Sequence, residues 1–410
     1  MPSQPDRQIR VLEVLEATGG GTRRHLNDVV LGLDRDRFEV SVACALGREP
    51  DFENDIRAMR EAGHRVDLVP MVRPIRPFSD LRALLKLRNL LRRCPVDIVH
   101  THSAKAGILG RLAARMTGVR HIVHTPHHFP FDMDVSMSSR GLYLIIEKIA
   151  ASFTSRIICV CPQERASARR RNLAPPERLV VIENGIPLEG VSIEPGTDLN
   201  VRRELNLTPD NLLVGVIGRF CKQKGQCYLI DAIPEIRRRV PEAVFLFIGG
   251  GEDRDALMRC ADQRGIADAC RFIEHQEDIN VFHRALDLLV MPSLWEGLPY
   301  TLLESMAAGT PVAAFETGGI TDVIDNRQNG LLAPRKDTAA LAEAVCTALT
   351  DPELRRRLAS NARRTVAEHY HLDDMIADIE QLYMILVKPD GKAGRGSGTL
   401  GPRMGRAVET

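Results

Sequence analysis

Residues 288–319 read LLVMPSLWEGLPYTLLESMAAGTPVAAFETGG, a stretch in which a strand, a turn and a helix follow one another. The apolar run that ends at Pro292 predicts a buried strand. The next periodic block has Pro299 at its start and Gly309 just past its end, which predicts a helix. Glu296 is therefore expected in the turn between the strand and the helix.

Two carboxylates are expected to face one crevice at this turn. Glu296 lies at the carboxyl end of the strand, and Glu304 projects about one turn into the following helix. Between them, the amides of Gly297, Leu298 and Tyr300 are expected to point outward at the helix N-terminus. Carboxylates accept hydrogen bonds from hydroxyl groups, and free amides donate to phosphate oxygens, so the turn suits a phosphorylated polyhydroxyl ligand. Two solvated surface glutamates are the alternative.

The whole block resembles the donor-sugar motif of the retaining glycosyltransferases of family 4, which have the GT-B fold. In that family, the first glutamate holds the hydroxyl groups of the transferred sugar and the second holds the ribose of the nucleotide. The resemblance assigns these roles to Glu296 and Glu304, and it places Gly297 and Leu298 at the donor. It extends over nearly all residues from Arg10 to Val387.

Composition and charge indicate a globular protein with locally defined binding sites. At 410 residues, the chain is long enough for two or three domains. Its hydrophobic share of 44% and charged share of 27% are ordinary for a soluble protein. Lysine and arginine total 55 against 54 acidic residues, so no nucleic-acid partner is expected.

Cysteine usage and the apolar segments predict a cytoplasmic location. Nine scattered cysteines do not form a disulfide framework in a chain of this size, which favours a reducing compartment. The longest apolar segment is interrupted by Glu147, Lys148 and Arg156, so no membrane-spanning helix is expected. The first ten residues contain no signal-peptide core.

The N-terminal segment RVLEVLEATGGGTRRHLNDVVLGL, starting at Arg10, predicts a strand, a glycine turn and a helix. Thr22 is expected to cap that helix. The glycines permit close approach of a ligand, or they make only a tight turn. In the resembled family, paired glycines at this place approach the donor phosphates, which implies that role for Gly20 and Gly21. The dinucleotide signature G-x-G-x-x-G is absent, which disfavours a nicotinamide oxidoreductase.

Strands and helices alternate in both halves of the chain, which predicts parallel, doubly wound sheets with ligands beyond the carboxyl ends of the strands. Histidines gather at two such strand ends, which suggests a functional site. The alternative is that each histidine is a hydrogen-bonded residue in the core or at the rim of the sheet. They are His100, His102, His124, His127 and His128. The segments around them resemble family members that build exopolysaccharide, capsule or lipid-linked glycans. The family's active-site histidine matches His127 best, but His128 stands where a small residue is usual, so the assignment stays between these neighbours.

A second strand-to-helix turn, GRFCKQKGQ, provides positive charge. Arg219 leaves a strand end, and Lys224 precedes the next helix just before Gly225. Two cations and a helix N-terminus suit a diphosphate, although each residue alone is more often a surface charge. In the family, an arginine and a lysine at this spacing neutralise the nucleotide diphosphate. Lys222 is expected to be solvated.

The alternation of strands and helices predicts an α/β fold class, and the resemblance implies GT-B with two Rossmann-like domains that face a central cleft. We expect an acceptor-binding domain over residues 1–187 and a donor-binding domain over residues 200–372, joined by a loose polar stretch that ends at Leu199. The family's last helix crosses back onto the first domain, and residues 373–387 are the candidate. The glycine- and arginine-rich tail, residues 389–410, is expected to be disordered.

The resemblance implies a hexosyltransferase, and the residues at the expected diphosphate site indicate that it needs no cofactor or metal ion. Three Asp-x-Asp patterns occur outside a suitable setting, and Arg219 and Lys224 can stabilise the leaving diphosphate. The expected partners are a nucleotide-sugar donor and a glycan or polyprenyl-linked acceptor. A basic face at Arg165 and Arg169–Arg171 is either a solvated helix surface or a contact with anionic lipid at the inner face of the plasma membrane. A sugar-nucleotide epimerase and a non-catalytic nucleotide-sugar-binding protein are the alternative functions.

Overall fold

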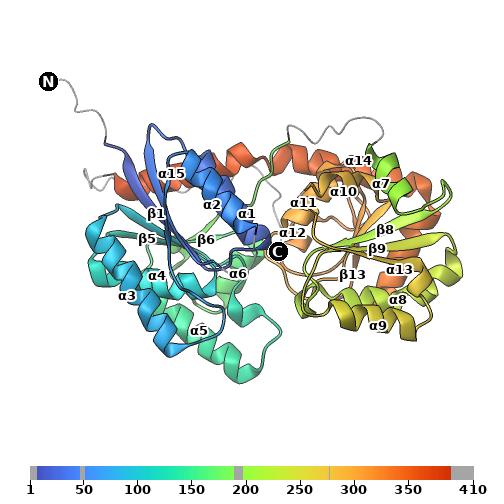
Figure 1. Ribbon diagram of the computed structural model, residues 1–410, viewed down its shortest axis with the longest axis horizontal. Helices are drawn as coiled ribbons and strands as arrows, with labels where there is room; N and C mark the ends of the chain where they lie inside the picture. The colour runs from blue at the N-terminus through green and yellow to red at the C-terminus, as the bar shows by residue number, and fades with distance from the viewer. Residues whose placement is uncertain (1–6, 47–50, 189–196, 277, 389–410) are drawn as a thin grey trace.

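The computed structural model describes residues 7–46, 51–188, 197–276 and 278–388, which form two parallel sheets with helices on both faces (Figure 1). The predicted tail, residues 389–410, lies outside the described residues. The first sheet has the order β3-β2-β1-β4-β5-β6-β7. Its strands are β1 (Ile9–Leu15), β2 (Phe38–Cys44), β3 (Arg65–Leu68), β4 (Ile98–His102), β5 (His121–Thr125), β6 (Arg156–Cys159) and β7 (Leu179–Val181).

The central strands of the first sheet are buried on both faces because helices cover each side. Along β1, Val11 packs into the core beneath one helix layer, whereas Leu12 packs into the core beneath the other. This alternation follows the two-residue period of a strand. One layer contains α1 (Gly20–Gly32) and α2 (Phe52–Glu61). The other contains α3 (Pro77–Arg93), α4 (Ala104–Thr117) and α5 (Met137–Ser152), and α6 (Pro162–Arg170) joins β6 to β7.

The second sheet has the order β10-β9-β8-β11-β12-β13 and all its pairings are parallel. Its strands are β8 (Leu212–Ile217), β9 (Ala243–Ile248), β10 (Cys270–Ile273), β11 (Leu288–Met291), β12 (Val312–Phe315) and β13 (Leu331–Ala333). One face packs on α8 (Gln226–Arg239), α9 (Arg254–Gln263) and α13 (Thr338–Thr350). The other packs on α7 (Thr197–Glu204), α10 (Asn280–Ala285), α11 (Tyr300–Ala307), α12 (Ile320–Val323) and α14 (Pro352–His369). The predicted fold class of two doubly wound parallel sheets is confirmed.

The last residues of the stretch expected to be loose up to Leu199 are helical, because α7 begins at Thr197. Val201 explains this difference, since its side chain is buried in the core of the second sheet. Tertiary packing therefore supports a short helix that its polar composition does not indicate.

The chain passes between the two sheets at two adjacent places. The amide of Ile186 donates to the carbonyl of Tyr370 at 2.9 Å, and the amide of Leu372 donates back to Ile186 at 3.0 Å. After this crossing, α15 (Leu372–Val387) packs along α1 on the first sheet (Figure 1). The absence of a side chain at Gly32 lets Ile376 of α15 approach α1 closely. Among the described residues, no helix combines the length and the apolar character needed to cross a bilayer.

Candidate active site

The turn between β11 and α11 carries a buried carboxylate, as the sequence predicts. Glu296 is 6% exposed, and Lys224 Nζ donates a hydrogen bond to its Oε1 atom at 2.6 Å. Gln223 Nε2 lies 3.4 Å from the other oxygen of Glu296 and donates to the carbonyl of Trp295 at 3.0 Å. Lys224 reaches this position because Gly225 adopts φ +63° and packs its Cα against the carbonyl of Pro292, where a side chain would not fit.

Two glycines that follow β12 fix the backbone of this turn. A Cβ atom at Gly318 would overlap the carbonyl oxygen of Glu296, and one at Gly319 would overlap that of Gly297. The amide of Gly319 also donates to the carbonyl of Gly297 at 2.9 Å. Among the described residues, no acceptor is found for the amides of Gly297 and Leu298, so both remain available to a ligand.

The first sheet contacts the same turn through the loop that follows β5. His127 and His128 adopt φ values of +56° and +119°, which few residues other than glycine tolerate. His128 Nδ1 lies 3.2 Å from the carbonyl oxygen of Glu296. A Cβ atom at Gly297 would lie 3.2 Å from the carbonyl oxygen of His127. Segments from both sheets therefore meet at the Glu296 turn.

A cleft of about 210 Å³ opens at this meeting point. His128 and Glu164 line it from the first sheet, and Glu296 and Arg335 line it from the second. Arg170 also lines the cleft, and Arg171 forms a 2.8 Å ion pair with Asp132. Of the basic face predicted on α6, Arg171 therefore has an ion-pair partner within the protein, whereas Arg170 is exposed at the edge of the cleft.

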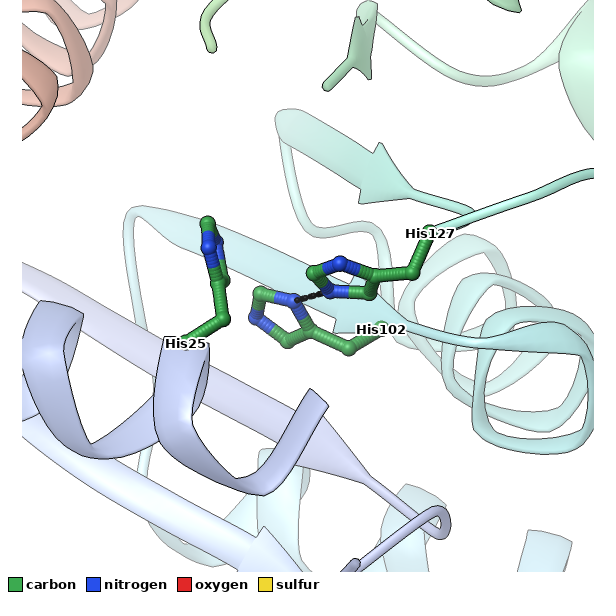
Figure 2. Close-up of side chains that lie close together, drawn as sticks. All are labelled: His25, His102 and His127. Carbon is green, nitrogen blue, oxygen red and sulfur yellow. Dashed lines mark hydrogen bonds between the residues drawn. The ribbon is translucent and has the colours of Figure 1, made fainter. Parts of the chain in front are cut away.

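The ring of His127 lies beside the rings of His25 and His102 (Figure 2) and is not among the side chains that line this cleft. Its Nε2 atom lies 3.1 Å from Nδ1 of His102. His102 Nε2 in turn lies 2.7 Å from a carboxylate oxygen of Glu13, which is fully buried in β1. The other oxygen of Glu13 accepts a hydrogen bond from Tyr383 of α15 at 2.8 Å. Glu13 therefore fixes the orientation of His102, and His102 contacts His127.

His25 of α1 completes a group of three histidines, which we call the histidine cluster: His25, His102 and His127 (Figure 2). His25 Nδ1 lies 3.1 Å from Oδ1 of Asn184, and Asn184 Nδ2 donates to the carbonyl of Leu298 at 2.8 Å. Asn184 thus connects the cluster to the Glu296 turn of the second sheet.

Burial keeps these histidines neutral. It lowers the pKa of His102 to about 4, and it holds the pKa values of His25 and His127 well below that of a free imidazole. Burial alone would raise the pKa of Glu13, but the adjacent His100 and His102 hold it well below its ordinary value. The cluster therefore contains neutral rings beside one carboxylate.

The histidine cluster could hold a metal ion, since one nitrogen from each ring lies within 4.8 Å of the others. His25 Nε2 is buried without a hydrogen-bond partner, while His102 Nδ1 and His127 Nε2 share a contact. Neutral imidazoles with their opposite nitrogens bound to Glu13 and Asn184 fit the donor set of zinc. A second group, Glu13 with His100 and His102, is held together by its own hydrogen bonds. The absence of a functional metal stays a prediction.

Glu304 lies where α1 and α11 meet. It forms an ion pair with Arg24 of α1, and Nε2 of the buried His283 lies 3.8 Å away. Arg24 stacks over the ring of Tyr300 at 4.9 Å. A Cβ atom at Gly21 would lie 3.2 Å from the same ring, so the glycine turn abuts the start of α11.

Other predicted residues have local contacts of their own and do not line the cleft. Gly20 adopts φ +57° with open space beside it. Arg219 leaves the end of β8, which pairs with β11, but its side chain is 43% exposed and its guanidinium pairs with Glu252 at 3.1 Å. The expected cap at Thr22 is wrong: Gly19 caps α1, and the Thr22 hydroxyl instead donates to the carbonyl of Ala17.

Sequence reasoning missed several residues of the site, notably Glu13, His25 and Arg24. Glu13 has a recognisable signal, because an acid between apolar neighbours on a strand must be buried and therefore paired. His25 and Arg24 have no such signal, since polar residues are ordinary on a helix. Their importance follows from contacts with Asn184 and Glu304, which are distant in sequence.

Two family models match the chain, Glycosyltransferase Family 4 over residues 19–189 and Glycosyl transferases group 1 over residues 198–365. The chain belongs to the group 1 glycosyltransferases. This glycosyltransferase is 28% identical over 388 residues to UDP-Gal:alpha-D-GlcNAc-diphosphoundecaprenol alpha-1,3-galactosyltransferase of Escherichia coli, covering 93% of this chain and 97% of that relative. It is 30% identical over 283 residues to D-inositol 3-phosphate glycosyltransferase of Frankia alni, covering 65% of this chain and 69% of the relative.

A solved structure shows the same fold. The glycosyltransferase aligns with Anabaena HepE, solved in complex with UDP and glucose, at a TM-score of 0.79 and 20% identity. The alignment covers 92% of this chain and all of HepE. The predicted family and the predicted GT-B fold are confirmed.

Proposed function

We propose that this glycosyltransferase moves a hexose from a nucleoside-diphosphate sugar to a hydroxyl group of a lipid-linked glycan, with retention of anomeric configuration. The observation that carries the proposal is the contact between Lys224 and Glu296 at the cleft where both sheets meet. An ammonium group suits a diphosphate, and a carboxylate suits sugar hydroxyl groups. The two groups that such a donor needs therefore lie side by side.

Donor binding replaces one set of partners with another. In the protein alone, Lys224 is paired with Glu296, and Arg24 is paired with Glu304. A bound donor offers phosphate oxygens to Lys224 and sugar hydroxyl groups to Glu296. Its ribose offers hydroxyl groups to Glu304. Arg219, at the end of the neighbouring strand β8, is the second cation proposed for the diphosphate. The free amides of Gly297 and Leu298 add further donors.

The reaction breaks the bond between the anomeric carbon and the diphosphate oxygen, and the electron pair of that bond passes to the diphosphate. Lys224 stabilises the resulting charge, so no metal ion is needed for departure of the diphosphate. Glu296 holds the sugar so that an acceptor oxygen reaches the anomeric carbon from the same face. The acceptor proton passes to the departing phosphate. His128 lines this space from the first sheet.

The acceptor proposal is supported by the E. coli relative, whose name specifies a diphosphoundecaprenol-linked substrate. A polyprenyl-linked acceptor resides in a membrane, so we place the protein at the inner face of the plasma membrane, in cell-surface polysaccharide biosynthesis. The first sheet, with His127 and His128, is the acceptor side of the cleft in this proposal.

Donor binding and transfer can be tested together. Thermal unfolding is measured with UDP-galactose, UDP-glucose, UDP-N-acetylglucosamine and GDP-mannose, because a ligand that binds the folded state raises the melting temperature. Each stabilising donor is then incubated with a diphosphoprenyl-linked sugar acceptor, and the product linkage is determined by NMR. The new glycosidic linkage is expected to have the same anomeric configuration as the sugar in the donor. An altered nucleotide sugar without acceptor would indicate an epimerase, and binding without turnover would indicate a non-catalytic protein.

A further inference from the structure

Exposed apolar side chains are concentrated on one layer of the first sheet. Of the fifteen large hydrophobic side chains that are exposed among the described residues, ten lie between Ile75 and Ile149. This segment contains α3, α4 and α5, which form consecutive helices of one layer (Figure 1). Large apolar groups gathered on one face mark an interaction site rather than a chance distribution.

Helix α3 has two apolar faces. Ala83, Leu87 and Leu91 are buried against the sheet. Phe78, Leu81 and Leu85 instead recur at helical spacing on the outer side, where they are 91%, 54% and 42% exposed. Ile75, just before the helix, is 71% exposed.

The same arrangement recurs on α5. Ala150 and Ala151 are buried, while Leu142, Ile145 and Ile149 are 52%, 58% and 62% exposed on the outer side. Met137, at the start of the helix, is 76% exposed. Between these helices, α4 exposes Leu112 and Met116. We call the outer side of these three helices the α3–α5 surface.

The charged residues of this surface are basic. Arg76, Arg82 and Lys86 are exposed beside the apolar residues of α3, and Arg115 and Lys148 are exposed on α4 and α5. Every acidic residue of the segment has a basic partner. The pairs are Asp80 with Lys105, Asp97 with Arg10, Asp132 with Arg171, Asp134 with Lys222, and Glu147 with Arg111. The unpaired charge is therefore positive.

We propose that the α3–α5 surface docks this glycosyltransferase on an anionic lipid bilayer. Apolar side chains enter the boundary between headgroups and acyl chains, and the basic residues contact lipid phosphates. A second copy of the chain is disfavoured as the occupant, because a symmetric contact would bring one basic surface against another. The inference rests on the proposed transfer to a lipid-linked acceptor.

The orientation of the surface suits such an acceptor. Helices of a parallel sheet begin at the carboxyl edge, which is the edge that faces the cleft. The most exposed apolar residues, Phe78 and Met137, lie at the beginning of α3 and α5. The loop with His127 and His128 leads into α5. A bilayer on this surface therefore holds a lipid-anchored sugar near the histidine side of the cleft.

The test measures lipid binding and transfer separately. Co-sedimentation uses vesicles of phosphatidylglycerol and phosphatidylethanolamine, compared with phosphatidylcholine alone. The double variant Phe78→Ser/Met137→Ser is expected to bind the anionic vesicles at least tenfold more weakly, and the variant Arg82→Glu/Lys86→Glu is expected to lose the preference for anionic lipid. Met258→Ser, on α9 of the second sheet, is the matched control and should bind like the wild type.

Transfer to a short-chain, water-soluble acceptor should be the same in the wild type and the double variant, whereas transfer to acceptor in vesicles should fall. Equal vesicle binding by wild type and double variant would overturn the docking surface. So would a wild type that ignores vesicles but forms a dimer that is lost in the double variant. Vesicle binding without any transfer would instead contradict the proposed function and leave the docking surface standing.

Discussion

Lys224 Nζ lies 2.6 Å from Glu296 Oε1, so the lysine proposed for the donor diphosphate is neutralised by the carboxylate proposed for the donor sugar. The pair is largely shielded, because the carboxylate side chain is 7% exposed and the lysine side chain 21%. Neither charge is left buried alone before the donor arrives, which avoids a desolvation cost of several kcal/mol. The same contact positions both groups for the ligand.

Replacing Glu296 with alanine is expected to lower transfer about 100-fold or more, because the sugar is no longer held against the acceptor. Binding of the nucleoside diphosphate should be unchanged or tighter, since Lys224 loses its competing partner. Calorimetric titration with the diphosphate and a transfer assay measure the two effects. Loss of nucleotide binding in this variant would contradict the roles proposed for the pair.

Replacing Lys224 with alanine is expected to weaken nucleoside-diphosphate binding about 10- to 100-fold, as expected for loss of a charged hydrogen bond. Lys222 provides a matched control, because its side chain is 67% exposed and pairs with Asp134. Lys222→Ala should bind the nucleotide with nearly the affinity of the wild type. Equal losses in both variants would indicate a general charge effect rather than a specific contact.

Gly318→Ala is expected to displace the Glu296 turn, because the new methyl group overlaps the Glu296 carbonyl and the backbone has φ +42°. We expect a loss of about 1–3 kcal/mol in the free energy of unfolding, together with reduced transfer. Gly141→Ala is the control, since nothing lies within 4 Å of its Cβ position on α5. Wild-type transfer by Gly318→Ala would show that the glycine does not set the turn.

The buried histidines should make the protein sensitive to acid. Burial lowers the pKa of His102 and of His283 to about 4, whereas an unfolded histidine has a pKa near 6.5. Below pH 6.5 the unfolded chain binds more protons, so stability falls as the pH decreases towards 4, by about 1.4 kcal/mol per pH unit for each histidine. Chemical denaturation between pH 7 and 5 measures this slope.

A single substitution can isolate the contribution of one buried histidine, His283, to the acid sensitivity. His283→Phe is expected to remove the contribution of one histidine from the pH dependence of the free energy of unfolding. The free energy of unfolding is measured by chemical denaturation at several pH values between 7 and 5 for the wild type and the variant, and the two slopes against pH are compared. If His283→Phe retained the full wild-type slope, the buried ring would not be a source of the acid sensitivity.

Transfer activity is expected to persist after treatment with EDTA, because Lys224 supplies positive charge at the departing diphosphate. The assay compares treated protein before and after addition of zinc, magnesium or manganese. Activity that is lost with the chelator and restored by zinc would instead implicate the histidine cluster. In that case, His25→Ala should abolish the restoration.

The strand, turn and helix around Glu296 could be predicted because local residues determine them. Pro299 and Gly309 mark the limits of α11, and the apolar run defines β11. The sequence also indicates that Lys224 and Glu296 lie at the same edge of the second sheet, since both residues follow neighbouring parallel strands.

Contacts between distant segments could not be predicted from such local signals. The partner of Glu304 is Arg24 on the other sheet, and no pattern near either residue indicates the pairing. His127 and His128 are adjacent, yet their positive φ values send one ring into the histidine cluster and the other to the Glu296 turn. The sequence therefore could not decide which of the two is the active-site histidine, because the decision depends on the backbone geometry of this loop.

Because Tyr383 donates a hydrogen bond to Glu13, the first sheet can be completed only late in protein synthesis. The ribosome makes the first sheet long before it makes α15, because 370 positions separate the two residues. Until that helix emerges, the carboxylate of Glu13 lacks one of its partners and the outer side of α1 lacks its cover. The first sheet is thus completed last although it is translated first, so it reaches its final form only after α15 has emerged.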